Sequence, residues 1–117
     1  MCYQWVYKMN RIQYADKAIV SLGNLNRIAK VMQKAAEGKD ITVGMIGGSI
    51  TQGSLSSTPE SCYAYLVYQW WVNTFRNSKV TYINAGIGAT TSQFAVARVD
   101  SDLLVYEPDF IITEFSV

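Results

Sequence analysis

The chain has 117 residues, half of them hydrophobic, with ten basic and nine acidic side chains and a formal net charge of +1. This length and composition fit one small globular domain with a single core and exclude an intrinsically disordered chain. The charges are mixed along the sequence and form no basic stripe, so nucleic acid is not an expected partner. No run of about 18 apolar residues is present, which predicts that no helix spans a membrane.

Two further features concern the compartment of the protein. The only two cysteines, Cys2 and Cys62, are far apart and lack a CxxC spacing. This argues against a zinc site or a disulfide framework and favours a reduced, packed thiol at Cys62. The first residues do not show the charged and apolar regions of a secretory signal peptide. We therefore expect a cytoplasmic protein by default, or a secreted one if the N-terminus is incomplete, and the sequence calls for no cofactor or metal ion.

The first part of the chain divides at residue 23. Residues 1–23 show no clear periodicity and are interpreted as a lead-in segment, and residues 24–117 are interpreted as the N-terminal part of a domain that is truncated in this sequence. Asn24 is a candidate N-cap for a helix, since apolar residues recur at helical spacing over 25–36. Gly38 is a suitable residue to end that helix.

The middle of the chain is predicted to contain two strands and one helix. Residues 41–46 are apolar enough for a strand that is buried on both faces. A polar loop over 52–61 leads to a helix over 62–75. A second strand covers 80–83, and a glycine-rich loop follows over 84–91. The helix side chains expected to face the core are Leu66, Val67, Trp70, Trp71 and Phe75.

The last predicted elements are a helix over 92–104 and a strand over 110–115, which Pro108 introduces. Helical spacing places Phe94, Ala97 and Leu104 on one side of this helix. Helices that alternate with strands in this way predict right-handed βαβ units and a parallel sheet. The expected fold class is therefore α/β, with about three strands present.

The edge at which parallel strands end is the expected place for a ligand site. Three segments reach this edge: 47–51, 84–92 and the end of the chain. Ser49 follows two glycines, Gly47 and Gly48, which permit a tight turn and the close approach of a substrate. Ser49 is a candidate nucleophile because the backbone N–H groups around it could bind an oxyanion. The same serine also fits a structural role as a helix N-cap or turn residue.

Nucleotide-binding motifs do not fit these glycine-rich turns. A G-x-G-x-x-G motif that starts at Gly86 and Gly88 fails because Thr91 stands at the last glycine position. A P-loop fails because no lysine follows Gly47 or Gly48. The G-x-S-x-G elbow of the α/β-hydrolases fails as well, because glycines do not stand two residues away on both sides of the serine.

Three segments, in order, resemble the sequence blocks of the SGNH or GDSL-type hydrolases. Segment 47–53, Gly-Gly-Ser-Ile-Thr-Gln-Gly, is similar to the first block, and segment 84–92, Asn-Ala-Gly-Ile-Gly-Ala-Thr-Thr-Ser, is similar to the second. The run over 98–117 resembles the approach to the third block, which in the family continues into an Asn-Asp pair. The resemblance covers roughly residues 20–117. It implies a three-layer α/β/α, flavodoxin-like fold with an incomplete sheet in the strand order 2-1-3.

The resemblance also implies the activity of a serine esterase or acylhydrolase. Ser49 matches the nucleophile, and its own N–H would be one oxyanion donor. A second backbone donor would come from Gly88 or Ala89, and the family usually has glycine at the position of Ala89. The further candidates for substrate contacts are Gly48, Thr51 and Asn84. The implied substrates are small acyl esters, with acetyl groups on a carbohydrate as the candidate that family analogy favours.

Two departures from the family pattern affect this expectation. Gly48 replaces the aspartate of the Gly-Asp-Ser motif, which is a known variant. The chain contains no histidine, and its aspartates cannot replace imidazole because carboxylates titrate at about 4. The third-block asparagine and the Asp-x-x-His of the family are also not found. We therefore expect the 117-residue chain to be inactive alone, and an unpaired edge of its last strand to lower its stability.

Other residues receive a structural interpretation. Arg98 and Asp100 are interpreted as a surface or interdomain charge pair, and Trp70 and Trp71 as packing residues rather than a sugar platform. The loop over 52–61 fits either a substrate pocket or a solvated loop. Two other functions stay open: a non-catalytic binding or interaction module on the same scaffold, and a small nucleotide-binding domain. The oligomeric state is not predicted.

Overall fold

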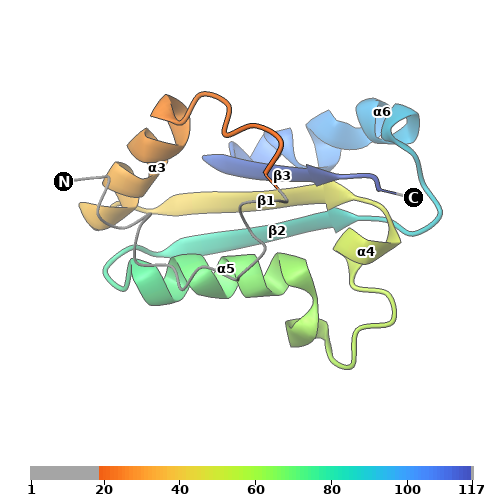
Figure 1. Ribbon diagram of the computed structural model, residues 1–117, viewed down its shortest axis with the longest axis horizontal. Helices are drawn as coiled ribbons and strands as arrows, with labels where there is room; N and C mark the ends of the chain where they lie inside the picture. The colour runs from red at the N-terminus through yellow and green to blue at the C-terminus, as the bar shows by residue number, and fades with distance from the viewer. Residues whose placement is uncertain (1–18, 117) are drawn as a thin grey trace.

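The computed structural model describes residues 19–116 and contains a three-stranded parallel sheet with helices on both faces (Figure 1). The strands are β1 (Ile41–Gly47), β2 (Val80–Gly86) and β3 (Phe110–Glu114). β1 lies in the middle, in the order β2-β1-β3, and pairs in parallel with both neighbours. The predicted α/β class and the strand order 2-1-3 are confirmed. Most of the predicted lead-in segment, including Cys2, lies outside the described residues.

Six helical segments are found between residues 19 and 116. The three longer helices are α3 (Asn26–Ala36), α5 (Tyr63–Thr74) and α6 (Ser92–Asp102). The three short segments are α4 (Ser49–Gln52), η1 (Pro59–Ser61) and η2 (Leu104–Tyr106). None of them is long and apolar enough to cross a membrane.

The two faces of the sheet are covered by different helices. On one face, Ile41 and Val43 of β1 pack in a cluster with Ala35 of α3 and Trp71 of α5. On the other face, Ile46 packs with residues of β2 and α6. Figure 1 shows α5 along one side of the sheet and α6 on the other. β1 is buried along almost its whole length, as expected for a central strand covered on both faces.

The start of α3 differs from the predicted cap, and its end agrees with the prediction. Leu25 occupies the N-cap position, although Asn24 accepts a hydrogen bond of 2.9 Å from the Asn26 N–H. Asn24 therefore supports the turn just before the helix and does not cap it. At the other end, Gly38 takes a φ of +77°, a left-handed conformation that glycine adopts without strain.

An aspartate ties α3 to the start of the sheet. Lys34, in the last turn of α3, pairs with Asp109 at 2.7 Å. The second carboxylate oxygen of Asp109 accepts a hydrogen bond of 2.9 Å from the Thr42 N–H. Asp109 thus joins the end of one helix to the beginnings of β1 and β3.

The packing of α5 confirms most of the predicted core. Trp71 and Phe75 are buried, and Trp70 and Val67 are half-buried. Both tryptophans therefore act in packing, and Cys62 just before the helix is buried as predicted. Leu66 was expected in the core, but it is 55% exposed. The helix is rotated so that the small Ala64 lies against the sheet, and this rotation carries Leu66 to the surface.

The structure also corrects the extent of several elements. β2 runs to Gly86 instead of ending at residue 83, so Asn84 belongs to a strand and not to the loop. α6 ends at Asp102, and η2 follows as a separate turn. The side of α6 that carries Phe94 and Ala97 is exposed, whereas the small Ala95 packs against the sheet.

β3 forms one edge of the sheet. Within residues 19–116 it pairs only with β1, so its outer edge has no partner strand there. Unpaired strand edges favour association with other chains. That this edge lowers the stability of the chain stays a prediction.

Candidate active site

The candidate nucleophile lies where the central strand ends. Gly47 is the last residue of β1, Gly48 occupies the N-cap position, and Ser49 is the first residue of α4. Ser49 therefore does not occupy the N-cap position, which was one of the structural roles considered for it. N–H groups in the first turn of a helix have no acceptor within that helix. Among the described residues, the Ser49 N–H has no backbone acceptor either, so it is free to donate.

Two glycines allow the chain segments of the site to touch. A Cβ atom at Gly47 would overlap the Thr51 hydroxyl and the Glu114 carbonyl oxygen. A Cβ atom at Gly86 would overlap the backbone of Gln52. Only residues without a side chain fit at these two positions. The ends of β1 and β2 are thereby held directly against the short helix that carries the serine.

The second candidate loop passes beside Ser49. The Ile87 N–H donates a hydrogen bond of 3.1 Å to the Gly47 carbonyl oxygen, which carries the loop past the end of β1. A Cβ atom at Gly88 would lie 3.6 Å from Ser49 Cβ. Ala89 has a φ of +58°, in the left-handed region that favours glycine. The structure thus brings together Ser49, Gly88 and Ala89, which the sequence analysis placed in one site.

Gln52 is a residue of this site that the sequence analysis missed. Its Oε1 accepts a hydrogen bond of 2.7 Å from the Gly88 N–H. One of the two candidate oxyanion donors is therefore engaged by a protein side chain. The spacing contained a signal for this, because residues three apart on a helical turn share one face. Gln52 stands three residues after Ser49.

Thr51 and Asn84 are built into the framework of the site. Thr51 is fully buried, with its hydroxyl 2.8 Å from the Tyr63 hydroxyl and 3.2 Å from a carboxylate oxygen of Glu114. Asn84 donates from Nδ2 to the Thr51 carbonyl oxygen at 2.8 Å and accepts from the Gly86 N–H at 2.9 Å. Both side chains hold α4 against the strand ends, and the Thr51 hydroxyl does not reach the surface.

Glu114 supplies the negative charge nearest to this framework. Hydrogen bonds from the Ser116 hydroxyl and backbone N–H, and then from Thr51, lower the pKa of Glu114 below its ordinary value of 4.5. The carboxylate is therefore ionised at neutral pH. Burial acts in the opposite sense on the neighbouring phenol and raises the pKa of Tyr63, so Tyr63 stays neutral and able to donate its proton to a hydrogen bond.

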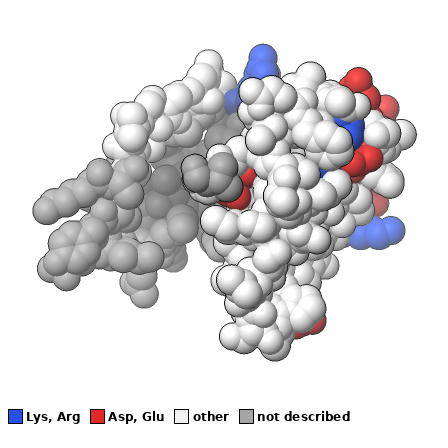
Figure 2. Space-filling view, turned by 90° about the vertical axis from the view of Figure 1, so that its right-hand side faces the viewer, with Lys and Arg blue, Asp and Glu red and all other residues white. Residues whose placement is uncertain are grey.

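The surface around this edge of the sheet carries few charges. Figure 2 looks at the side of the molecule toward which the strands point, and its described surface is mostly free of charged side chains. Most of the charged groups visible there lie in the right-hand part of the view, and two further acidic groups are visible, one near the centre and one at the lower end. A surface of this kind suits a neutral ligand better than a highly charged one.

Arg98 is placed differently from the prediction of a surface charge pair with Asp100. Its side chain is only 9% exposed, and it pairs with Asp102 at 3.1 Å. Asp102 stands four residues on, on the same helix face, whereas a residue two positions on points elsewhere. Hydrogen bonds, first from Ser101 and then from Arg98, lower the pKa of Asp102. The ion pair is therefore partly buried and local to α6.

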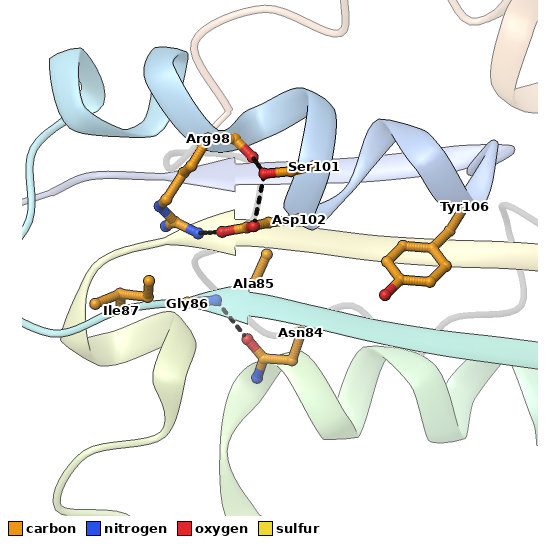
Figure 3. A pocket seen from close by; sticks show the side chains of 8 residues that line it. All are labelled: Asn84, Ala85, Gly86, Ile87, Arg98, Ser101, Asp102 and Tyr106. Atoms are coloured by element: carbon orange, nitrogen blue, oxygen red, sulfur yellow. Dashed lines mark hydrogen bonds and ion pairs between the residues drawn. The ribbon is translucent and has the colours of Figure 1, made fainter.

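A separate pocket of about 320 Å³ lies between the end of β2 and α6 (Figure 3). Residues 84–87 form one wall, and Arg98, Ser101, Asp102 and Tyr106 form the other. Ser49 is not among its lining residues. In the part of the chain that the structure describes, no group of three or more His, Cys, Asp or Glu side chains could hold a metal ion.

Two solved structures are similar to this chain in sequence and in fold. One is a crystal structure of a two-domain esterase active on acetylated mannans, with 58% identity and a TM-score of 0.87 over 92% of this chain and 29% of that chain. The other is a crystal structure of such an esterase co-crystallised with mannopentaose, with 62% identity and a TM-score of 0.80 over 81% of this chain and 26% of that chain. This chain thus spans less than a third of either structure.

A scan against protein-family models and a search of curated proteins found no match. The two matched structures support the α/β fold of the chain. They are also consistent with the resemblance of three segments of this sequence to the SGNH or GDSL-type hydrolases.

Proposed function

We propose that this chain carries the nucleophile of an SGNH-type serine esterase that removes acetyl groups from a mannan-like carbohydrate. The observation that carries the proposal is the position of Ser49 at the end of the central strand, beside a second glycine-rich loop. Its backbone N–H has no backbone acceptor among residues 19–116. The substrate class is supported by the two similar structures, both of esterases active on acetylated mannans. The mostly uncharged surface in Figure 2 agrees with a neutral carbohydrate ester.

In the proposed reaction, Ser49 Oγ attacks the carbonyl carbon of the ester and loses its proton to a base. The oxyanion that forms accepts hydrogen bonds from the Ser49 N–H and from the loop at Gly88 and Ala89. The alcohol leaves, and water then hydrolyses the acyl-enzyme to release acetate and free the serine. This sequence contains no histidine, so an imidazole base must come from another part of the protein.

The Gln52 side chain occupies one donor of the proposed oxyanion hole when no substrate is bound. Its carbonyl oxygen accepts from the Gly88 N–H, as a substrate oxyanion would. We propose that the ester oxygen replaces Gln52 Oε1 when substrate binds. The exchange costs little, because one hydrogen bond replaces another and the Gln52 side chain is exposed.

The 117-residue chain alone is expected to be inactive, since the loss of the base of a serine triad lowers the rate by orders of magnitude. The check is turnover of p-nitrophenyl acetate by the purified chain and by Ser49→Ala. Equal background rates are expected. A rate above background that Ser49→Ala abolishes would show that the chain supplies its own base.

The esterase function itself is tested in a chimera in which residues 19–116 replace the matching segment of the two-domain esterase. We expect the chimera to release acetate from acetylated mannan, and Ser49→Ala to lower this rate at least about 1000-fold. Ser57→Ala, which changes an exposed serine of the 52–61 loop, is the matched control and should leave the rate unchanged.

The alternative is a non-catalytic binding module on the same scaffold. In that case the chimera would fold and bind mannan without releasing acetate, and Ser49→Ala would change nothing. A cooperative unfolding transition of the chimera, measured before the assay, separates this result from simple misfolding.

A further inference from the structure

A short chain of hydrogen bonds joins three elements next to Ser49. The Thr51 hydroxyl of α4 lies 2.8 Å from the Tyr63 hydroxyl of α5 and 3.2 Å from a carboxylate oxygen of Glu114, the last residue of β3. Thr51 is fully buried. A buried hydroxyl with two polar partners fixes the orientation of the element that carries it, because moving the element would leave those partners unpaired.

The hydrogen bonds of this chain run in one direction. An ionised carboxylate only accepts hydrogen bonds, so Thr51 donates its single hydroxyl proton to Glu114. The proton between Thr51 and Tyr63 must therefore come from the phenol. The other carboxylate oxygen of Glu114 accepts from the Ser116 backbone N–H at 2.6 Å and from the Ser116 hydroxyl. Glu114 thus ends the chain with both of its oxygens engaged.

The backbone brings Glu114 directly against α4. Gly47 of β1 pairs in register with Glu114 of β3. Because Gly47 has no side chain, the Thr51 hydroxyl fits into the space beside it. The Glu114 carbonyl oxygen also accepts a hydrogen bond of 3.3 Å from the Gly48 N–H. Glu114 therefore holds both ends of the segment 48–51, one through its main chain and the other through its side chain.

The orientation of α4 determines where Ser49 points. α4 has only four residues, and a single helical turn has little stability of its own. Residues two apart on a helix point in nearly opposite directions, because each residue turns the helix by about 100°. The Thr51 hydroxyl lies on the side of Gly47. Ser49 lies on the other side, where its Cβ is 3.6 Å from the place of a Cβ atom at Gly88.

We propose that Glu114 is a positioning residue for the nucleophile: its hydrogen bond with Thr51 fixes the rotation of α4 and so directs Ser49 toward the loop at Gly88. This inference rests on the proposed esterase function, because it gives Glu114 a role in the reaction of Ser49. Glu114 does not act as the base in this role, since its carboxylate is engaged by Thr51 and Ser116.

Glu114→Ala and Glu114→Gln separate positioning from charge. Both changes remove the charge, but glutamine can keep the contacts. Its carbonyl oxygen can accept from the Ser116 N–H while its amide donates to Thr51, whose hydroxyl then donates to Tyr63. In the chimera, Glu114→Ala should lower kcat on acetylated mannan by about 10- to 100-fold and change KM by less than about twofold, because a misplaced nucleophile slows the chemical step. Glu114→Gln should keep kcat within about threefold of the unmodified chimera.

Asp109→Ala is the matched control for a simple loss of stability. Asp109 stands just before β3, at the end opposite Glu114. Its carboxylate also accepts from a backbone N–H and from a side chain, those of Thr42 and Lys34, and neither residue belongs to α4. Asp109→Ala should therefore lower the melting temperature but leave kcat unchanged, with each variant assayed well below its melting temperature. An unchanged kcat in Glu114→Ala, or an equal loss of kcat in both alanine variants, would overturn the inference.

Thr51 provides a second pair of variants if Glu114→Ala does not fold. Thr51→Val keeps the shape of the side chain and removes the hydroxyl, whereas Thr51→Ser keeps the hydroxyl and removes the methyl group. The kcat of Thr51→Ser should exceed that of Thr51→Val by about 10-fold, because only serine retains the bond to Glu114. Equal values, or a higher kcat for Thr51→Val, would overturn the inference.

Crystal structures of the chimeras give a readout that does not depend on activity. Ser49 Oγ should occupy the same position in the unmodified chimera and in Glu114→Gln, and should be displaced by about 1 Å or more in Glu114→Ala. If the unmodified chimera releases no acetate, the proposed esterase function fails, and the position of Ser49 in these three structures alone tests the role of Glu114. The same position of Ser49 in all three would overturn that role.

Discussion

The side-chain carbonyl of Gln52 and the backbone N–H of Gly88 are joined by a hydrogen bond of 2.7 Å. The bond links the short helix that carries Ser49 to the loop that lies beside it. It also places an acceptor on the N–H that the proposed reaction uses to stabilise an oxyanion. The chemistry of position 52 should therefore affect catalysis even though Gln52 takes no part in proton transfer.

Gln52→Glu in the chimera should lower kcat for acetyl-ester hydrolysis by about 100-fold, the cost typical of losing one oxyanion donor. The new carboxylate would bind the Gly88 N–H more strongly than the amide and would repel the oxyanion. Gln33→Glu, an exposed change on α3, is the control and should have little effect. Equal kcat values for Gln52→Glu and the unmodified chimera would show that the Gly88 N–H is not a donor in the reaction.

The glycines before Ser49 should differ sharply in their tolerance of a methyl group. Gly47→Ala should destabilise the protein by about 3 kcal/mol or prevent folding, because its Cβ would overlap Thr51 and Glu114. Gly48→Ala should cost less than about 1 kcal/mol, since the nearest atom to its Cβ would be the Thr90 carbonyl oxygen at 3.8 Å. Urea unfolding of both variants measures the difference, and similar losses would contradict the packing described at the end of β1.

Because Ala89 has a left-handed backbone conformation, its replacement by glycine should stabilise the folded protein. At a φ of +58°, alanine carries a strain of about 1 kcal/mol that glycine avoids, and the greater flexibility of unfolded glycine offsets only part of this gain. Ala89→Gly should therefore raise the free energy of unfolding by about 0.5 kcal/mol. Ala97→Gly on the exposed face of α6 should lower it by about 1 kcal/mol. A loss at both positions would rule out the left-handed conformation at Ala89.

Acid should destabilise the chain partly through Glu114. Its pKa is lowered in the folded state, first by the hydrogen bond from the Ser116 hydroxyl. A carboxyl group of this kind stabilises the fold above its ordinary pKa of 4.5, and this contribution is lost as the pH falls through the lower folded value. The free energy of unfolding should therefore fall below pH 4.5 less steeply in Glu114→Gln than in the unmodified chain. Glu60→Gln, at an exposed position on η1, should leave the slope unchanged.

The sheet was predictable because its strands are apolar and short and lie between clear helical patterns. The burial of β1 on both faces follows from its composition. The rotation of the helices was less predictable, because periodicity defines an apolar stripe without saying which part of it touches the sheet. Leu66 was expected inside, but the small Ala64 takes the closest contact.

The candidate site was predictable as far as backbone geometry determines it. Ser49 and Gly88 lie close together because each follows the end of one of two neighbouring parallel strands, and Ala89 is the next residue of the chain. The side-chain contacts of Gln52 and Arg98 were not predicted, since they depend on the direction of long side chains. The partner of Arg98 could have been deduced, because Asp102 is four residues away and Asp100 only two.

The most direct test of the central claim is covalent labelling of the chimera with a fluorophosphonate, which reacts with activated serines. Peptide mass spectrometry should find the adduct on Ser49, and acetate release should fall in proportion to the labelling. The Ser49→Ala chimera should take up no label. An active chimera that is labelled on another serine, or that is inhibited without any adduct at Ser49, would contradict the assignment of Ser49 as the nucleophile.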